Sequence, residues 1–160
     1  MKVIIAENYA QQSSLAADII EKIVREEPEC CLGLATGSSP VGMYKELARR
    51  CREDGLDFSK VHTVNLDEYV GLEGDHDQSY RYFMNDNLFD HINIDKANTF
   101  VVKGTGDIDA NIKEFNDVLA NSKVAVQVLG VGPDGHLGFN EPNETLWYSA
   151  HKEVLDESTI

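Results

Sequence analysis

Residues 129–142 carry the side chains of this chain that are best suited to chemistry. The segment reads LGVGPDGHLGFNEP, and its Asp134, His136 and Glu141 can exchange protons near neutral pH. A plain strand-to-helix turn would explain the glycines and carboxylates, but it has no need of His136. We expect proton transfer here and no metal, because one histidine without a second at matching spacing makes a weak metal site. The other histidines lack such neighbours and are expected at the surface or in the core: His62, His76, His91 and His151.

Asp67 and Glu68 form a second candidate, directly after the expected strand 61–66 and before Tyr69. Alternation along a strand would point the two carboxylates to opposite sides, so at most one of them faces a given site. Apolar neighbours can raise the pKa of such a carboxyl towards the range that suits a general base. A solvated loop is the alternative interpretation.

The third candidate is the segment TGSSP at residues 36–40. Gly37 lets the main chain turn, and Thr36, Ser38 and Ser39 offer hydroxyl groups just before an expected helix. Free N–H donors and the positive end of a helix dipole both favour a phosphate group. The segment is neither a P-loop nor a dinucleotide-binding fingerprint, and a capped helix start explains it equally well.

Each of these loops follows an apolar run in a chain that alternates strands and helices. Strands are expected over 2–6, 30–35, 61–66, 99–102 and 124–129, and helices over 8–26, 40–53, 79–89 and 108–120. Ser39 is the expected N-cap of the second helix, with Pro40 at its first position. The alternation predicts an α/β fold, a Rossmann-like, open, mostly parallel sheet with helices on both faces. Such sheets form their sites at the carboxyl ends of the strands, where all three loops lie.

Composition narrows the classes of function. With 160 residues the chain predicts a single domain, and its net charge of −14 disfavours binding to nucleic acid. No apolar run reaches membrane-spanning length, and the first residues are too few for a signal peptide, so no membrane partner is expected. Cys30, Cys31 and Cys51 are odd in number and form no Cys-x-x-Cys pair, which favours reduced thiols and a cytoplasmic location.

The segments at 36–40, 66–72 and 132–142 resemble, in this order, three signature segments of the glucosamine-6-phosphate deaminase family. The resemblance implies conversion of glucosamine 6-phosphate and water to fructose 6-phosphate and ammonia, with no metal or other cofactor. It implies that Asp67 removes the C2 proton of this small amino-sugar phosphate.

The same resemblance implies roles for the other loops. His136 would open the sugar ring by proton transfer, oriented and charged by Asp134 and Glu141. The phosphate would be held by the loop after the first buried strand: Thr36, Gly37, Ser38 and Ser39.

Length is the main departure from the family. Its members continue well beyond residue 160, so residues 1–160 are expected to form a sugar-phosphate isomerase/deaminase domain whose C-terminal part is absent. Two basic residues that clamp the phosphate in the family, and the last strands of the sheet, would belong to that part. Activity of this chain alone and its assembly into a homo-oligomer are left open.

Three other functions remain in view. A 6-phosphogluconolactonase has a similar third segment, but it usually carries Asp-Glu-Arg in the second segment, where this chain has Tyr69. A deaminase or isomerase of galactosamine 6-phosphate would share all the segments. A sugar-phosphate sensor or inactive binding fragment would have little need to keep Asp67, Asp134, His136 and Glu141 together.

Overall fold

The computed structural model describes residues 2–132, 135–140 and 149–155. Its elements follow one another as α1 (Tyr9–Glu26), β1 (Cys31–Leu34), α2 (Val41–Glu53), β2 (His62–Asn65), α3 (Tyr80–Asn87), two 3₁₀ turns (Phe89–His91 and Lys96–Asn98), β3 (Thr99–Phe100), α4 (Ile108–Asn121) and β4 (Val124–Gln127). Within these ranges, no helix is both long and apolar enough to cross a membrane.

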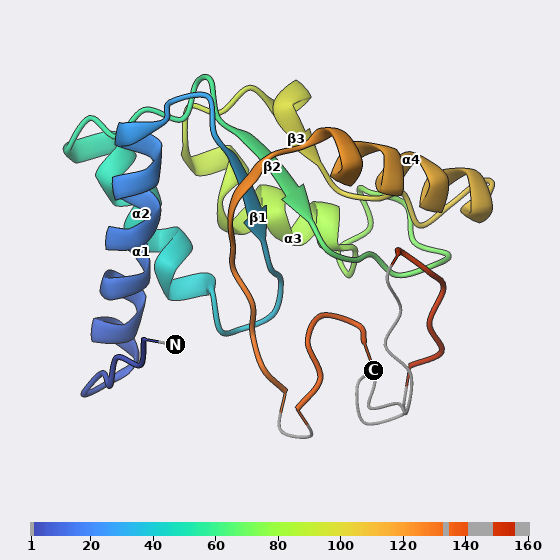
Figure 1. Cartoon of the computed structure of the whole chain (residues 1–160), viewed down its shortest axis with the longest axis horizontal. Coiled ribbons are helices and arrows are strands. Elements are labelled where there is room, and N and C mark those ends of the chain that lie inside the picture. The colour runs from blue at the N-terminus through green and yellow to red at the C-terminus, as the bar shows by residue number, and fades with distance from the viewer. Residues whose placement is uncertain (1, 133–134, 141–148, 156–160) are drawn as a thin grey trace.

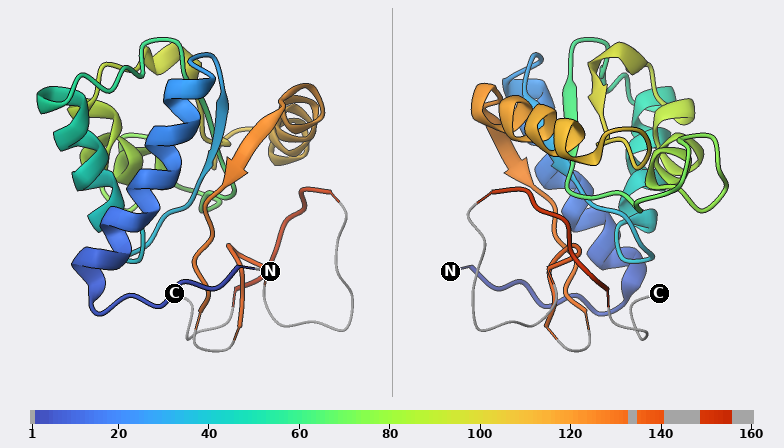
Figure 2. Two further views of the ribbon diagram at one scale, coloured as in Figure 1. Left: turned by 60° about the vertical axis from the view of Figure 1, so that its left-hand side comes forward. Right: turned by 90° about the vertical axis from the view of Figure 1, so that its right-hand side faces the viewer.

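The four strands form one sheet in the order β3-β2-β1-β4, and every pairing is parallel (Figure 1). Helices α1, α2 and α3 cover one face of this sheet, and α4 lies on the other (Figure 2). On that second face Phe115 of α4 stacks on Phe100 of β3, with ring centroids 5.9 Å apart. The predicted α/β architecture is therefore confirmed.

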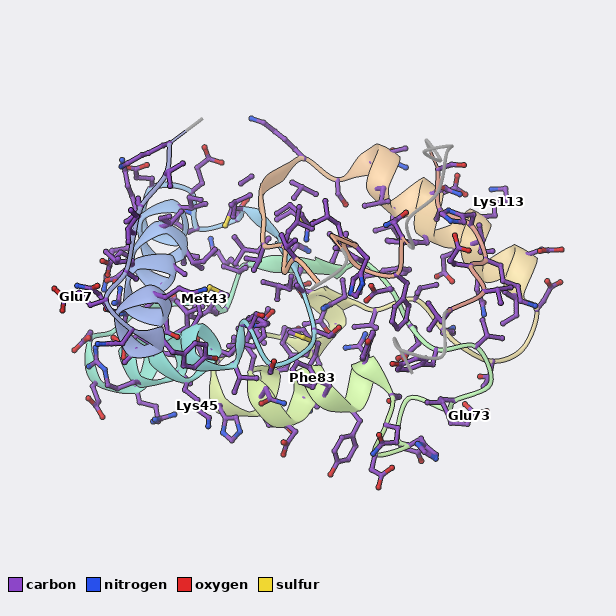
Figure 3. All side chains as sticks on the ribbon, turned by 90° about the horizontal axis from the view of Figure 1, so that it is seen from below. Glu7, Met43, Lys45, Glu73, Phe83 and Lys113 are labelled. Atoms are coloured by element: carbon purple, nitrogen blue, oxygen red, sulfur yellow. The ribbon has the colours of Figure 1, made fainter. Side chains whose placement is uncertain are left out.

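The main core lies between the sheet and the first three helices. Buried α1 residues recur at the spacing of one helical face, and Figure 3 shows Met43 of α2 directed inward and Lys45 outward. The largest side chains that this packing buries include Ile20, Leu32, Leu34, Tyr44, Leu47, Met84 and Phe89. Because this core holds β1 and β2 against α1, α2 and α3, it also fixes the loops at the carboxyl ends of these strands.

The predicted strand over residues 2–6 is wrong. This segment pairs with none of the four strands, and Val3, Ile4 and Ile5 are 71%, 50% and 91% exposed. Figure 2 shows it passing below the strands and not alongside an edge. A short apolar run becomes a strand only where a neighbouring strand accepts its hydrogen bonds, and this segment lies beside neither edge strand.

The predicted cap of α2 is also wrong. Pro40, and not Ser39, is the N-cap residue, with φ −83° and ψ −9° and no side-chain hydrogen bond. Its carbonyl accepts the first helical hydrogen bond, from Tyr44 N at 3.0 Å. The proline ring fixes a helical φ, which places the start of the helix at Pro40 and leaves Ser39 one position too early to cap it.

Candidate active site

A cavity of about 340 Å³ opens at the carboxyl ends of β1, β2 and β4. It is lined by residues from each of the three loops that the sequence singled out: Thr36, Gly37, Ser38, Ser39, Asp67 and His136. Asp134 and Glu141, the other two predicted site residues, lie outside the described residues. The parallel sheet brings the three loops together because the strands before them all end at the same edge.

Asp67 is the half-buried carboxyl group of this cavity. Its pKa is raised to about 6: burial is the main cause, the negative charge of Glu68 adds to it, and a hydrogen bond from the Phe139 backbone N–H acts in the opposite direction. The carboxylate lies so close to the β4 loop that a Cβ on Gly138 would be 3.0 Å from Asp67 Oδ2. Gly138 also has φ +59°, so glycine is required there on two grounds. A carboxyl group with this pKa is ionised at pH 7 and basic enough to remove a proton from an acidified carbon atom.

Glu68 faces away from the cavity and binds the start of α3. Its carboxylate accepts hydrogen bonds from the backbone N–H groups of Tyr69 at 2.9 Å, Tyr80 at 2.8 Å and Arg81 at 3.0 Å. Negative charge at a helix N-terminus is stabilising. The two adjacent carboxylates therefore separate as the alternation predicts: Asp67 faces the cavity and Glu68 anchors the loop.

Three aromatic rings hold the loops against one another. The ring centroids of Tyr69, Tyr80 and Phe139 lie 4.9 to 5.2 Å apart. Burial raises the pKa of Tyr80, so its phenol stays neutral; the Tyr69 side chain raises this pKa further and the Thr36 side chain lowers it. The Tyr80 ring thus links the β2 loop, through Tyr69, to the β4 loop, through Phe139. Sequence reasoning missed Tyr80 and Phe139, and the only signal for Tyr80 was the aromatic content of its helix.

His136 is held at the cavity wall by a tight fold of the β4 loop. Gly132 N donates to the His136 carbonyl at 3.0 Å, and Gly135 N donates to the Gly132 carbonyl at 3.0 Å. The imidazole lies directly over Gly132, where a Cβ would be 2.3 Å from His136 Cε1. The glycines of this segment therefore serve to pack the backbone against the histidine ring.

The β1–α2 loop supplies the polar wall of the cavity. Ser38 and Ser39 lead into α2, and Gly37 turns the chain with φ +84°. No lysine or arginine is among the described residues that line the cavity. An anion at this wall would be held by hydroxyl groups, backbone N–H groups and the helix dipole.

His151 lies on the other side of Asp67, where the sequence predicted only a surface or core group. It lines a second cavity of about 520 Å³, to which Asp67 and Phe139 also contribute. His151 Nε2 is 3.1 Å from Glu153 Oε2, and the segment is tied to α4 by a hydrogen bond of 3.0 Å from Ala150 N to Asn116 Oδ1. No local sequence pattern indicates this proximity, because it depends on how residues 149–153 pack against α4.

The described part of the chain contains no group of three histidine, cysteine or acidic side chains that could hold a metal ion. Asp134 and Glu141 are not among the residues to which this applies. What the described geometry offers is a base of pKa near 6, an imidazole and a polar wall for an anion, all on one cavity.

Comparison with known proteins identifies the family. A sequence model described as glucosamine-6-phosphate isomerases/6-phosphogluconolactonase matches residues 6–147. The chain belongs to this family. Among its relatives, glucosamine-6-phosphate deaminases from Clostridium perfringens (strain ATCC 13124) and Clostridium tetani are 52% and 48% identical to it. Both matches cover 100% of this chain and 67% of the relative.

Solved structures of the family agree with the fold. A monomeric glucosamine-6-phosphate deaminase superposes with a TM-score of 0.94 at 39% identity, covering 99% of this chain and 67% of that one. A 6-phosphogluconolactonase from Thermotoga maritima superposes with a TM-score of 0.70 at 22% identity, covering 88% of this chain and 67% of that one. The second similarity shows the shared fold alone.

Proposed function

We propose that the chain converts glucosamine 6-phosphate and water to fructose 6-phosphate and ammonia. One observation carries this proposal: Asp67, with its pKa raised to about 6, lines the same cavity as His136 and the Thr36–Ser39 loop. The reaction needs a carboxylate over a carbon acid, a separate acid–base group at the ring oxygen and a place for the phosphate. Relatives that are 44–52% identical to the chain are glucosamine-6-phosphate deaminases.

Asp67 acts as the base in this proposal. In the open-chain sugar, C2 carries the amino group and lies next to the C1 aldehyde, so its hydrogen is acidic. Asp67 removes this proton while the aldehyde oxygen gains one from solvent, which gives an enolamine. Asp67 then returns its proton to C1, which gives a protonated imine at C2. Water adds to the imine and ammonia leaves, which produces fructose 6-phosphate. A base of pKa near 6 can both accept and return the proton at neutral pH.

His136 opens the sugar ring in this proposal. The imidazole gives a proton to the ring oxygen and takes one from the C1 hydroxyl, and Asp134 and Glu141 orient and charge it. The phosphate is bound by Ser38, Ser39 and the start of α2, with Thr36 and Gly37 shaping the loop. This assignment rests on His136 and the β1–α2 loop lining one cavity with Asp67.

Residues 1–160 are proposed to form a single sugar-phosphate domain, which is supported by the one core shared by α1, α2, α3 and the sheet. The chain spans 67% of the length of its deaminase relatives. Its partner is a small amino-sugar phosphate. A homo-oligomer and a monomer are both retained as alternatives, and one similar solved deaminase is monomeric. A cytoplasmic location is supported by the free cysteines Cys30, Cys31 and Cys51.

The test is ammonia release from glucosamine 6-phosphate by the purified chain, with Asp67→Asn as the inactive variant. Asp77→Asn, at a side chain 74% exposed, is the matched control and should retain activity. Galactosamine 6-phosphate and 6-phosphogluconolactone are the competing substrates. Release that only Asp67→Asn abolishes supports the proposal. Release from galactosamine 6-phosphate alone, lactone hydrolysis without ammonia, or full activity of Asp67→Asn would contradict it.

A further inference from the structure

The hydroxyl group of Tyr9 holds the β1–α2 loop from outside the cavity. It donates to the Ser38 carbonyl at 2.9 Å and lies 3.2 Å from the Ser39 carbonyl, while it accepts from the Gly42 backbone N–H at 2.8 Å. Ser38 and Ser39 line the cavity, whereas Tyr9 is not among the described residues that do so. Tyr9 therefore contacts the loop and not the space that a ligand would fill.

The absence of a side chain at Gly42 makes this contact possible. A Cβ on Gly42 would lie 2.9 Å from Tyr9 Cε1 and 2.2 Å from Ser13 Oγ. Glycine lets the first turn of α1 approach the first turn of α2 until the phenol reaches the backbone. Figure 2 shows the beginning of α1 and the β1–α2 loop at the same end of the molecule.

The contact completes the N-terminus of α2. Its N-cap residue, Pro40, makes no side-chain hydrogen bond, so the first N–H groups of the helix have no local acceptor. Tyr9 supplies an acceptor for one of them, at Gly42. A residue on another helix thus does what the sequence predicted for Ser39.

The contact also sets the direction of one peptide group. In a planar trans peptide, the carbonyl and the N–H point to opposite sides. Because the Ser38 carbonyl is turned towards Tyr9, the N–H of Ser39 in the same peptide points away from Tyr9. A carbonyl oxygen facing a phosphate would repel it, whereas an N–H would bind it.

We propose that Tyr9 is a positioning residue that directs the Ser39 N–H into the cavity and holds the Ser38 carbonyl out of it, so that the β1–α2 loop binds the phosphate of the substrate. The inference rests on the proposed function only for the identity of the phosphate ester. Its effect falls on the binding of a phosphate group and not on proton transfer at Asp67.

The experiment compares Tyr9→Phe with wild type, and Tyr82→Phe is the matched control. The two side chains are similarly exposed, 49% for Tyr9 and 41% for Tyr82. Tyr82 belongs to α3 and not to the contact with the β1–α2 loop. Calorimetric titration with inorganic phosphate gives a dissociation constant, and ammonia release from glucosamine 6-phosphate gives KM and kcat. We expect Tyr9→Phe to weaken phosphate binding and raise KM by about 3- to 10-fold, the effect of one lost hydrogen bond, with kcat changed less than about two-fold.

A second variant, Tyr9→Leu, separates the hydroxyl from the ring. It should raise the dissociation constant for phosphate as much as Tyr9→Phe does and lower the unfolding temperature further. If Tyr9→Phe binds phosphate as wild type does, the inference is wrong, whatever happens to the unfolding temperature. The two proposals can fail separately. If Tyr9→Phe binds phosphate more weakly than wild type, and wild type itself releases no ammonia, the inference is supported and the proposed reaction is contradicted.

Discussion

The charged groups between α1 and α2 and those at the carboxyl end of β2 have opposite surroundings. Between the helices, the buried guanidinium of Arg50 contacts Glu21 at 2.6 Å, Asp18 at 2.7 Å and Glu46 at 2.9 Å. At the end of β2, Asp67 accepts a hydrogen bond from the Phe139 backbone N–H and has a second carboxylate as its sequence neighbour. One region pairs its charges with opposite charges, and the other keeps a carboxyl group beside a like charge.

The pKa values of the two regions move in opposite directions. Arg49 and Arg50 lower the pKa of Glu46 to about 2, and Arg25 and Arg50 lower the pKa of Glu21. Burial raises the pKa of Asp67 to about 6. Lowered values mean that ionised carboxylates stabilise the fold, whereas a raised value means that ionised Asp67 destabilises it at neutral pH. Such a cost is typical of a group retained for its reactivity.

The largest expected effect comes from Asp67→Asn. Removing the base should lower kcat for ammonia release by about 10³-fold, within the usual contribution of a general base. Binding of inorganic phosphate should stay within about two-fold of wild type, because the phosphate site that we propose is the β1–α2 loop and not Asp67. At pH 7 the variant should be more stable than wild type, since it lacks the unfavourable buried charge. Exchange of the C2 proton at the wild-type rate would remove Asp67 from the mechanism.

The next effect tests the other half of the comparison. Arg50→Met should lower the free energy of unfolding by about 2–3 kcal/mol, because it leaves Glu21 and Glu46 with fewer cationic partners. Measured per folded molecule, kcat should not change. Arg52→Met, at an exposed position on the same helix, is the control and should change stability by less than about 0.5 kcal/mol. If the free energy of unfolding falls equally in the two variants, the ion pairs of Arg50 make no specific contribution to stability.

A pH titration should separate the two regions by sign. Below pH 6 the value of kcat/KM should fall about tenfold per pH unit, because protonated Asp67 cannot act as a base. The pKa of Asp67 is about 6 in the folded protein and near 3.8 in the unfolded chain. Ionised Asp67 therefore destabilises the fold fully above pH 6, and this effect disappears as the pH falls from 6 to 3.8. Urea unfolding of wild type and Asp67→Asn should therefore give converging stabilities between pH 7 and 4.

The carboxylates around Arg50 should act in the reverse direction. The folded pKa of Glu46, about 2, lies below its unfolded value near 4.5, so its stabilising effect is present above pH 4.5 and is lost as the pH falls towards 2. Stability of Arg50→Met should accordingly depend less on pH than stability of wild type in this acid interval. An equal pH dependence would contradict the comparison.

The sequence predicts the sheet well, because each strand lies in a short segment with apolar residues bounded by turn residues, although β2 reads HTVN and β4 is only partly buried. Residues 30–35, 61–66 and 124–129 each contain an observed strand. Residues 2–6 have a similar composition, yet they form no strand. The three observed strands each have a neighbouring strand to pair with, whereas residues 2–6 have none, and no local sequence pattern indicates this difference.

The candidate site divides in the same way. Asp67 and His136 are predictable because reactive side chains follow apolar runs at the ends of strands. Tyr80 and Tyr9 are not, because each reaches a site loop from a helix: the Tyr80 ring of α3 packs on Tyr69 and Phe139, and the Tyr9 hydroxyl of α1 bonds to the Ser38 carbonyl. Motifs identify the groups that could react, and tertiary packing decides which side chains hold them.

The smallest expected effect concerns Glu68, which stabilises the start of α3 and also raises the pKa of Asp67. Glu68→Gln keeps Oε1 as the acceptor for the N–H groups of Tyr69 and Tyr80 but replaces Oε2, the acceptor for the Arg81 N–H, by an NH2 group. It also removes the negative charge that raises the pKa of Asp67. The acid limb of the kcat/KM profile should therefore shift to lower pH, and the loss of charge at the start of α3 should cost about 1 kcal/mol. Asp75→Asn, at an exposed position in the same loop, is the control and should change neither the acid limb of the kcat/KM profile nor the free energy of unfolding. If Glu68→Gln leaves the acid limb in place while α3 is destabilised, Glu68 only anchors the loop, and the raised pKa of Asp67 comes from burial alone.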